Sequence, residues 1–141
     1  MPVTPYLMFE GRCEEAIEFY KSAVGAEVQM LMRNSESPTP PAPGVLPSGT
    51  DHKILHATIR INDSLLHASD GHCQGKPTFQ GFTLSYTIDD ASKAEKAFAA
   101  LSNGGQVQMP LSPTFFSPSF GMLTDRFGVS WMVYVPRPMP S

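Results

Sequence analysis

Two histidines, His56 and His67, have the clearest potential for chemistry in this sequence. They lie in two apolar, alternating segments, Lys53–Ile61 and Ser64–Ser69, which are separated by Asn62-Asp63. Asn and Asp tolerate left-handed backbone, so this pair suits a tight two-residue turn between antiparallel strands. Such a turn fixes the register and places the two histidines on one face, diagonal to each other, with roughly 7–8 Å between their backbones.

Three roles are open for this pair of imidazoles. With Asp70 or a water molecule as third ligand, two neutral rings would suit Zn or another transition metal. The rings could instead contact a bound small molecule. In the third interpretation they only form hydrogen bonds within the fold.

Other polar side chains share this face or an equivalent one. Arg60 would favour an anionic ligand, such as a carboxylate or phosphonate, through forked hydrogen bonds, or it could extend into solvent at the sheet edge. Trp131 could stack on a ligand or belong to the core. The candidate ligand-binding residues are therefore His56, Thr58, Arg60, His67, Ser69, Thr83, Ser85 and Trp131.

The first half of the chain supplies the elements that position these residues. Pro5–Phe9 predicts a strand, and the three- and four-residue spacing of apolar residues predicts a helix over Glu14–Val24. Glu27–Arg33 predicts a further strand. Residues 34–50 contain five prolines and two glycines without a period, which indicates an irregular loop. We expect the helix to cover the hairpin face made by Leu55, Ala57, Ile59, Ile61, Ser64, Leu66 and Ala68.

The same pattern then restarts. Gly81–Ile88 predicts a strand whose polar face carries Thr83, Ser85 and Thr87, and Asp89 or Asp90 can cap a helix that ends at Asn103-Gly-Gly105. Two more strands follow, roughly over Phe115–Thr124 and Val129–Val135. The repeat is visible in letters, because Gly25-Ala-Glu-Val-Gln-Met30 is matched by Gly104-Gly-Gln-Val-Gln-Met109. The sequence therefore predicts two copies of one unit around a shared, polar-lined pocket.

Several motifs together resemble the PhnB-like branch of the vicinal oxygen chelate superfamily. They are Pro5-Tyr-Leu-x-Phe-x-Gly11, Glu14-Glu-Ala-Ile-Glu-Phe-Tyr20, Ile54-Leu-His-Ala57, Ala68-Ser-Asp70, Gly104-Gly-x-Val107, Met109-Pro-Leu111 and Phe120-Gly-x-x-x-Asp-x-Phe-Gly-Val-x-Trp-Met132. The resemblance implies one α+β domain over 1–141, with two tandem βαβββ modules at about 3–70 and 81–136. It also implies a curved mixed sheet around a cup, with helices outside, and a homodimer.

Metal enzymes of that superfamily hold a divalent ion on the first and last strands of each module. Aligning the modules carries those positions to about Pro5 and Thr83, to Leu66 or His67, and to Met132. Proline and methionine side chains have no nitrogen or oxygen donor for a hard cation, and a threonine hydroxyl is a weaker ligand than an imidazole or a carboxylate. The resemblance therefore leaves the usual metal site largely absent, and a divalent metal cofactor stays open.

The expected function is the binding of a small molecule, with Arg60 favouring an anion, in the manner of bleomycin-resistance relatives. The alternative is a divalent-metal-dependent lyase, isomerase or dioxygenase of glyoxalase type with a non-standard site. PhnB-like sequences often carry a ubiquinone-related methyltransferase label, which we discount because the chain has no Gly-rich strand-to-helix loop. Whether any reaction is catalysed stays open.

Composition narrows the class of partner. A net charge of -3 with 41% hydrophobic and 16% charged residues indicates a globular protein with no nucleic-acid footprint. No run approaches the ~20 apolar residues of a membrane span, and the start lacks signal-peptide features, so we expect a cytoplasmic protein. Cys13 and Cys73 are expected to be free thiols, and a helix start near Cys13 could lower its pKa and make it a nucleophile.

Overall fold

The computed structural model describes residues 2–39, 42 and 44–137 and divides the chain into two compact units, Met1–Thr78 and Phe79–Ser141. Each unit holds a four-stranded sheet that mixes parallel and antiparallel pairs. Each sheet is accompanied by one helix of 12 residues. The predicted α+β fold of two repeated modules is confirmed.

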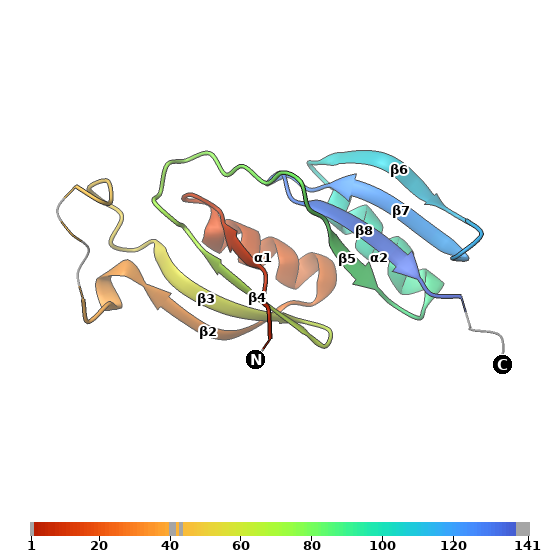
Figure 1. Cartoon of the computed structure of the whole chain (residues 1–141), viewed down its shortest axis with the longest axis horizontal. Coiled ribbons are helices and arrows are strands. Elements are labelled where there is room, and N and C mark those ends of the chain that lie inside the picture. The colour runs from red at the N-terminus through yellow and green to blue at the C-terminus, as the bar shows by residue number, and fades with distance from the viewer. Residues whose placement is uncertain (1, 40–41, 43, 138–141) are drawn as a thin grey trace. The chain divides into compact units, whose positions relative to one another are not determined.

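The first unit contains β1 (Tyr6–Met8), α1 (Cys13–Val24), β2 (Glu27–Arg33), β3 (Ile54–Ile61) and β4 (Ser64–Ser69), in the sheet order β1-β4-β3-β2 (Figure 1). The helix buries its apolar stripe against one face of this sheet because its buried residues recur at three- and four-residue steps. The closed face of the sheet consists of Leu7, Ala57, Ile59, Ile61, Leu66 and Ala68, all buried.

The hairpin of β3 and β4 has the predicted register. Thr58 pairs with His67 and Ile61 with Ser64, and Asn62 in the turn adopts a left-handed backbone with φ 53°. One expectation for the closed face was wrong. The pairing of β2 with β3 shifts between Met32 and Arg33, so Ile54 is 1% exposed and Leu55 is 39% exposed. A bulge of this kind adds one residue to a strand, so side chains beyond it point to the opposite face from the one that simple alternation predicts.

Asp70, directly after β4, ties three segments of the first unit together. Its buried carboxylate accepts hydrogen bonds from the backbone N–H groups of Gly11 (3.0 Å) and Cys13 (2.8 Å) through Oδ1, and of Ile54 (2.7 Å) through Oδ2. Cys13 is the first residue of α1, so the carboxylate also lies at the positive end of that helix. One side chain thus joins the end of β4 to the starts of α1 and β3.

The second unit contains β5 (Leu84–Thr87), α2 (Ala91–Ser102), β6 (Gln106–Ser112), β7 (Ser119–Thr124) and β8 (Ser130–Val135), in the order β5-β8-β7-β6. Asp90 caps α2 by accepting a hydrogen bond from the Lys93 N–H at 3.0 Å. Asp125 occupies a turn, as the sequence indicates, and its buried carboxylate accepts from the backbone N–H groups of Phe127 and Val129.

Each of the three strands expected in the second unit is shorter than the sequence indicated, the last of them by one residue, because it starts at Ser130 and not at Val129. The predicted strand over Gly81–Ile88 shortens to Leu84–Thr87, and the one over Phe115–Thr124 starts only at Ser119. Residues 114–117 instead form a turn in which the Thr114 hydroxyl accepts from the Ser117 N–H at 3.0 Å. Strand β6 received no bounds from the sequence, because Pro110 interrupts its pattern.

Among the described residues, no helix is long and apolar enough to cross a membrane. The loop after β2 begins with a short 3-10 turn, Asn34–Glu36, and is otherwise irregular where it is described. Arg33 anchors its start by pairing with Glu14 of α1 at 2.8 Å. That pairing, by hydrogen bonding and charge attraction, lowers the pKa of Glu14 below its ordinary value.

The arrangement around Asp70 generates a test. Asp70→Asn should lower the free energy of unfolding by about 2–4 kcal/mol, because the amide turns one acceptor into a donor that faces a buried N–H. Urea denaturation followed by circular dichroism measures this. Asp89→Asn, a change at an exposed position, is the matched control and should be near neutral. Equal stability of the two variants would contradict the role assigned to Asp70.

Candidate functional site

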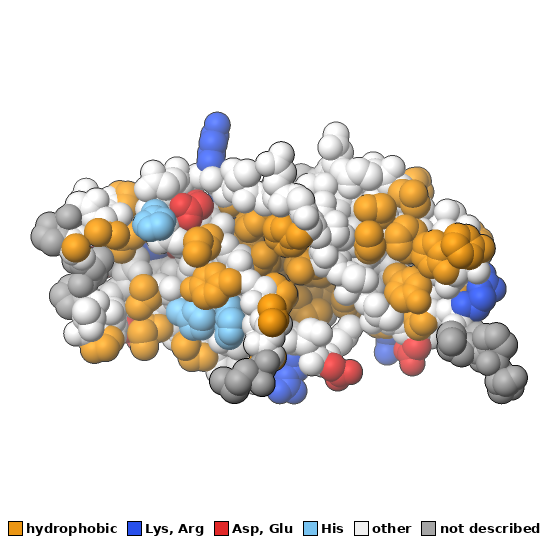
Figure 2. Space-filling view, viewed as in Figure 1, with side chains coloured by type: hydrophobic (Ala, Val, Ile, Leu, Met, Phe, Trp, Pro, Cys, Tyr) orange, Lys and Arg blue, Asp and Glu red, His pale blue; other side chains and the backbone are white. Residues whose placement is uncertain are grey.

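The face of the first sheet opposite α1 carries both polar and large apolar side chains that solvent reaches. We call it the open face. The pairing of β1, β2, β3 and β4 places on it Tyr6, Met8, Glu27, Met30, Met32, His56, Thr58, Arg60, Leu65 and His67, with Glu27 directly opposite Arg60. Tyr6, Met8, Met30 and Leu65 are each more than a third exposed. Figure 2 shows histidine side chains among hydrophobic ones over this unit.

Four side chains of the open face form one hydrogen-bonded chain. The Tyr6 hydroxyl lies 3.1 Å from His56 Nδ1, and the Thr58 hydroxyl lies 3.4 Å from His56 Nε2 and 3.1 Å from His67 Nδ1. The two imidazole centroids are 5.0 Å apart. Hydroxyls and neutral imidazoles each donate and accept, so the chain can run in either direction with every contact satisfied. The two histidines thus meet as the hairpin register predicts.

His56 is the member of this chain with a shifted pKa. Partial burial, and secondly the neighbouring His67, lower the pKa of His56 below its ordinary value of 6.5. Both causes penalise the charged imidazolium. The lowered pKa favours the neutral ring, which can both donate and accept a hydrogen bond.

Arg60 and Ser69 differ in their availability to a ligand. Arg60 is exposed on the open face, and no ion pair or side-chain hydrogen bond joins it to another described residue. Ser69 is 4% exposed, and its hydroxyl accepts a hydrogen bond from the Gly71 N–H at 3.0 Å. The structure therefore leaves Arg60 as a candidate ligand contact and gives Ser69 a role in the turn after β4.

The candidate ligand-binding residues of the second unit also differ in their availability to a ligand. Thr83 is half-buried just before β5, and Ser85 is exposed on that strand, facing away from α2. The expectation that Trp131 contacts a ligand needs correction. Its side chain lies on the helix-covered face, is 2% exposed, and donates a hydrogen bond from Nε1 to Asp125 Oδ2 at 2.9 Å. An indole held in this way belongs to the core.

The structure also shifts the positions where a divalent metal would be expected. In the parallel strand pairs, His67 lies beside Tyr6, and Met132 lies beside Ser85, instead of Pro5 and Thr83. Asp70, the expected third ligand for the histidines, is committed to three backbone N–H groups. No group of three or more His, Cys, Asp or Glu that could hold a metal occurs within the described ranges. These residues do not fit a hard divalent ion.

Cys13 is unsuited to nucleophilic chemistry. Cys13 and Cys73 are free thiols, as expected, but Cys13 is completely buried. Burial, followed by the nearby carboxylates of Asp70 and Glu14, raises the pKa of the Cys13 thiol. The helix start therefore does not make Cys13 a nucleophile, because desolvation and the neighbouring negative charges disfavour the thiolate.

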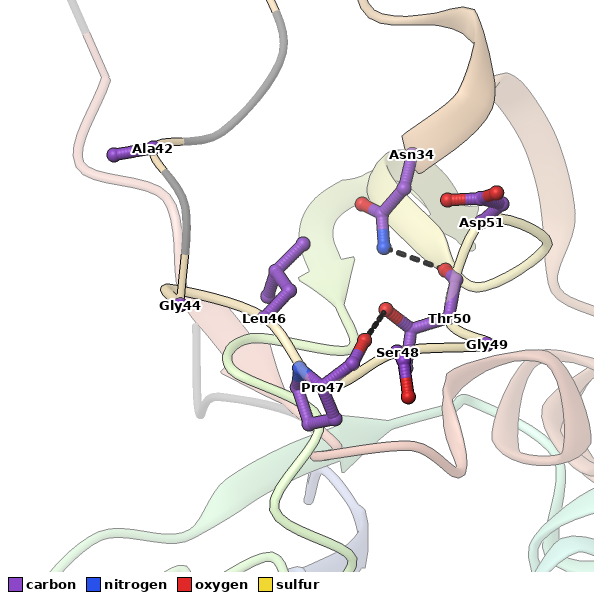
Figure 3. A pocket seen from close by; sticks show the side chains of 9 residues that line it. All are labelled: Asn34, Ala42, Gly44, Leu46, Pro47, Ser48, Gly49, Thr50 and Asp51. Carbon is purple, nitrogen blue, oxygen red and sulfur yellow. Dashed lines mark hydrogen bonds between the residues drawn. The ribbon is translucent and has the colours of Figure 1, made fainter.

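A separate pocket of about 270 Å³ lies in the loop between β2 and β3 (Figure 3). Its polar side chains mostly hold the loop itself: Asn34 Nδ2 donates to the Thr50 carbonyl at 2.9 Å, and the Thr50 hydroxyl donates to the Pro47 carbonyl at 2.7 Å. Asp51 is the only titratable residue among those that line it. The open face offers more chemistry than this pocket.

Sequence reasoning missed Tyr6 and the methionines as members of the site. Tyr6 enters because β1 pairs with β4 in parallel, which places it beside His67. Met30 and Met32 enter because β2 is the edge neighbour of β3. A signal existed in the alternation of Met30 and Met32 along β2, but the sequence alone does not say which strand lies beside the histidines.

Comparison with known proteins relates the whole chain to one family. A family model described as 3-demethylubiquinone-9 3-methyltransferase matches residues 1–134. Protein YjdN of Escherichia coli (strain K12) is 35% identical over 146 residues, covering 100% of this chain and 99% of that protein.

Solved structures from the same family have a similar fold over nearly the whole chain. Protein PA1353 from Pseudomonas aeruginosa is 38% identical with a TM-score of 0.83, over 98% of this chain and 99% of that one. A putative 3-demethylubiquinone-9 3-methyltransferase, PhnB protein, from Bacillus cereus is 30% identical with a TM-score of 0.78, over 96% and 99%. A glyoxylase/bleomycin resistance protein/dioxygenase domain from Frankia sp. EAN1pec, 13% identical over 96% and 94%, shares the fold with a TM-score of 0.63.

The hydrogen-bonded chain generates a prediction for solution. An NMR titration of the imidazole signals should place the pKa of His56 below 6.5. His67→Ala should raise it only part of the way back, because burial is the larger cause. The folded state then holds fewer protons than the unfolded one, so His56 lowers stability as the pH falls through 6.5 toward the folded pKa. A pKa at or above 6.5 would contradict the geometry described.

Proposed function

Since the chain belongs to the PhnB-like family described as 3-demethylubiquinone-9 3-methyltransferase, we propose that it binds a small organic anion on the open face of its first sheet. The observation that carries the proposal is the hydrogen-bonded chain of Tyr6, His56, Thr58 and His67. These polar groups lie on a sheet face that solvent reaches, where a purely structural network has no need to be.

The polar groups suit a ligand with a charged or hydrogen-bonding end. Arg60 lies two residues beyond Thr58 on β3 and shares its face, so its guanidinium can reach an anion bound near the histidines. A planar guanidinium with free donors matches a carboxylate or a phosphonate by forked hydrogen bonds. His56 and His67 add donors or acceptors according to their tautomers.

The apolar groups suit the rest of such a molecule. Met8, Met30 and Leu65 are 49%, 43% and 43% exposed, which is high for large apolar side chains on one sheet face. Flexible thioether side chains adapt to irregular ligand shapes and make favourable contacts with aromatic rings. Tyr6, whose ring centroid lies 5.4 Å from that of His56, supports an aromatic or conjugated body.

Two other activities are less well supported. A glyoxalase-type metal enzyme needs hard donors that this face does not gather. Methyl transfer, which the family description names, has no support in the architecture: each sheet is mixed and four-stranded, and neither shows the parallel, doubly wound order of nucleotide-binding folds. A homodimer, a cytoplasmic location and a pocket shared by the two modules stay predictions.

Ligand screening tests this proposal. A panel of aromatic carboxylates and phosphonates should raise the thermal midpoint of the wild-type chain, and a compound at one hundred times its Kd should add about 2.7 kcal/mol of stability. Arg60→Gln should weaken binding of the best compound by about tenfold, as expected for the loss of one charge-assisted contact.

Lys96→Gln removes the same charge from an exposed position on α2 and serves as the control. Titration calorimetry gives the Kd of each variant. Equal affinity in Arg60→Gln and wild type, or equal weakening in both variants, would refute the role of the open face.

A further inference from the structure

Sulfur donors lie beside the imidazoles of the open face. In the pairing of β2 with β3, Met32 is the direct partner of His56, and Met30 is the partner of Thr58. Directly opposed residues on neighbouring antiparallel strands have Cβ atoms roughly 4.5–5.5 Å apart, within reach of a long thioether side chain. The register thus brings a thioether and two imidazoles to one patch.

The two rings already have a spacing that suits a shared ion. Their centroids are 5.0 Å apart. Imidazoles that bind one metal at about 2.0–2.1 Å from each nitrogen have centroids roughly 5–6 Å apart. His56 Nε2 and His67 Nδ1 both approach the Thr58 hydroxyl, so the nitrogens already converge on one point. A shared ion would replace the Thr58 hydroxyl as the common partner of both nitrogens.

The donor set also selects the kind of metal. Two neutral nitrogens and a thioether form a soft, uncharged set, which suits Cu(I) far better than Mg²⁺ or Ca²⁺. Asp70, the carboxylate that the sequence suggested as third ligand, is occupied by backbone N–H groups. The guanidinium of Arg60 on the same face disfavours a doubly charged cation more than a singly charged one.

We propose that the open face binds one Cu(I) ion through His56, His67 and the thioether of Met32. Of its ligands, only His67 falls on a position expected for the divalent site of the wider superfamily, and the thioether donor and the ion differ from that site. The organic anion proposed above would contact the same two histidines, but Cu(I) binding can be tested in its absence. Binding involves no change of oxidation state, since the ion arrives and stays as Cu(I).

The test uses Cu(I) itself as the probe. The full chain is titrated under anaerobic conditions with excess ascorbate and bicinchoninate as the coloured competitor. Wild type should remove one equivalent of Cu(I) from the competitor. Met32→Leu keeps the volume of the side chain but lacks sulfur, and it should weaken binding by about tenfold or more. His67→Ala should abolish one-equivalent binding, and circular dichroism checks that each variant is folded.

Met109→Leu is the matched control. Met109 is the counterpart of Met30 in the repeated Val-Gln-Met segment, and its partner on β7 is Met122, with no histidine at that pair. This variant should bind as wild type does. The proposal is overturned if wild type fails to compete, if Met32→Leu binds as tightly as wild type, or if Met109→Leu is weakened equally.

Discussion

The buried carboxylate of Asp70 is the interaction on which the first unit depends. It accepts three backbone hydrogen bonds from segments that are far apart in the sequence, at Gly11, Cys13 and Ile54. A buried carboxylate is tolerated only when its oxygens are fully hydrogen-bonded, and here the bonds come from peptide groups that would otherwise be orphaned at a helix start and a strand start. These three hydrogen bonds, which we call the Asp70 clamp, hold the start of α1 against one face of the sheet and so leave the other face open.

The second unit also has a buried aspartate that accepts backbone hydrogen bonds, but this residue holds a different part of the structure. Asp125 also accepts two backbone hydrogen bonds, but its other oxygen takes the indole N–H of Trp131. The Asp125 clamp therefore holds a large side chain in the core, whereas the Asp70 clamp holds the starts of α1 and β3. The sheet faces that point away from the helices also differ between the two units. In the first unit His67 of β4 lies beside Tyr6 of β1, whereas in the second unit Met132 of β8 lies beside Ser85 of β5. The two units share one architecture, but the paired histidines lie only on the sheet of the first unit.

Much of the fold follows from local sequence. Both helices, the β3–β4 hairpin and the meeting of His56 with His67 were predictable, because period, capping residues and turn chemistry are local properties. Contacts between segments that are distant in the sequence could not be predicted. The parallel pairing that adds Tyr6, the edge strand that adds Met32, and the three donors that occupy Asp70 each depend on tertiary structure. The exposure of Leu55 depends on a register shift, which residue types alone do not reveal.

Ligand binding to the open face of the first sheet should change the surroundings of the methionines on that face. Methionine-methyl NMR tests it directly, because the described methionines divide evenly between the units: Met8, Met30 and Met32 in one, Met109, Met122 and Met132 in the other. Spectra of the methyl-labelled chain would be recorded with and without a saturating anion found by screening. We predict that the signals of Met30 and Met32 move most. Movement confined to Met109, Met122 and Met132 would contradict the account.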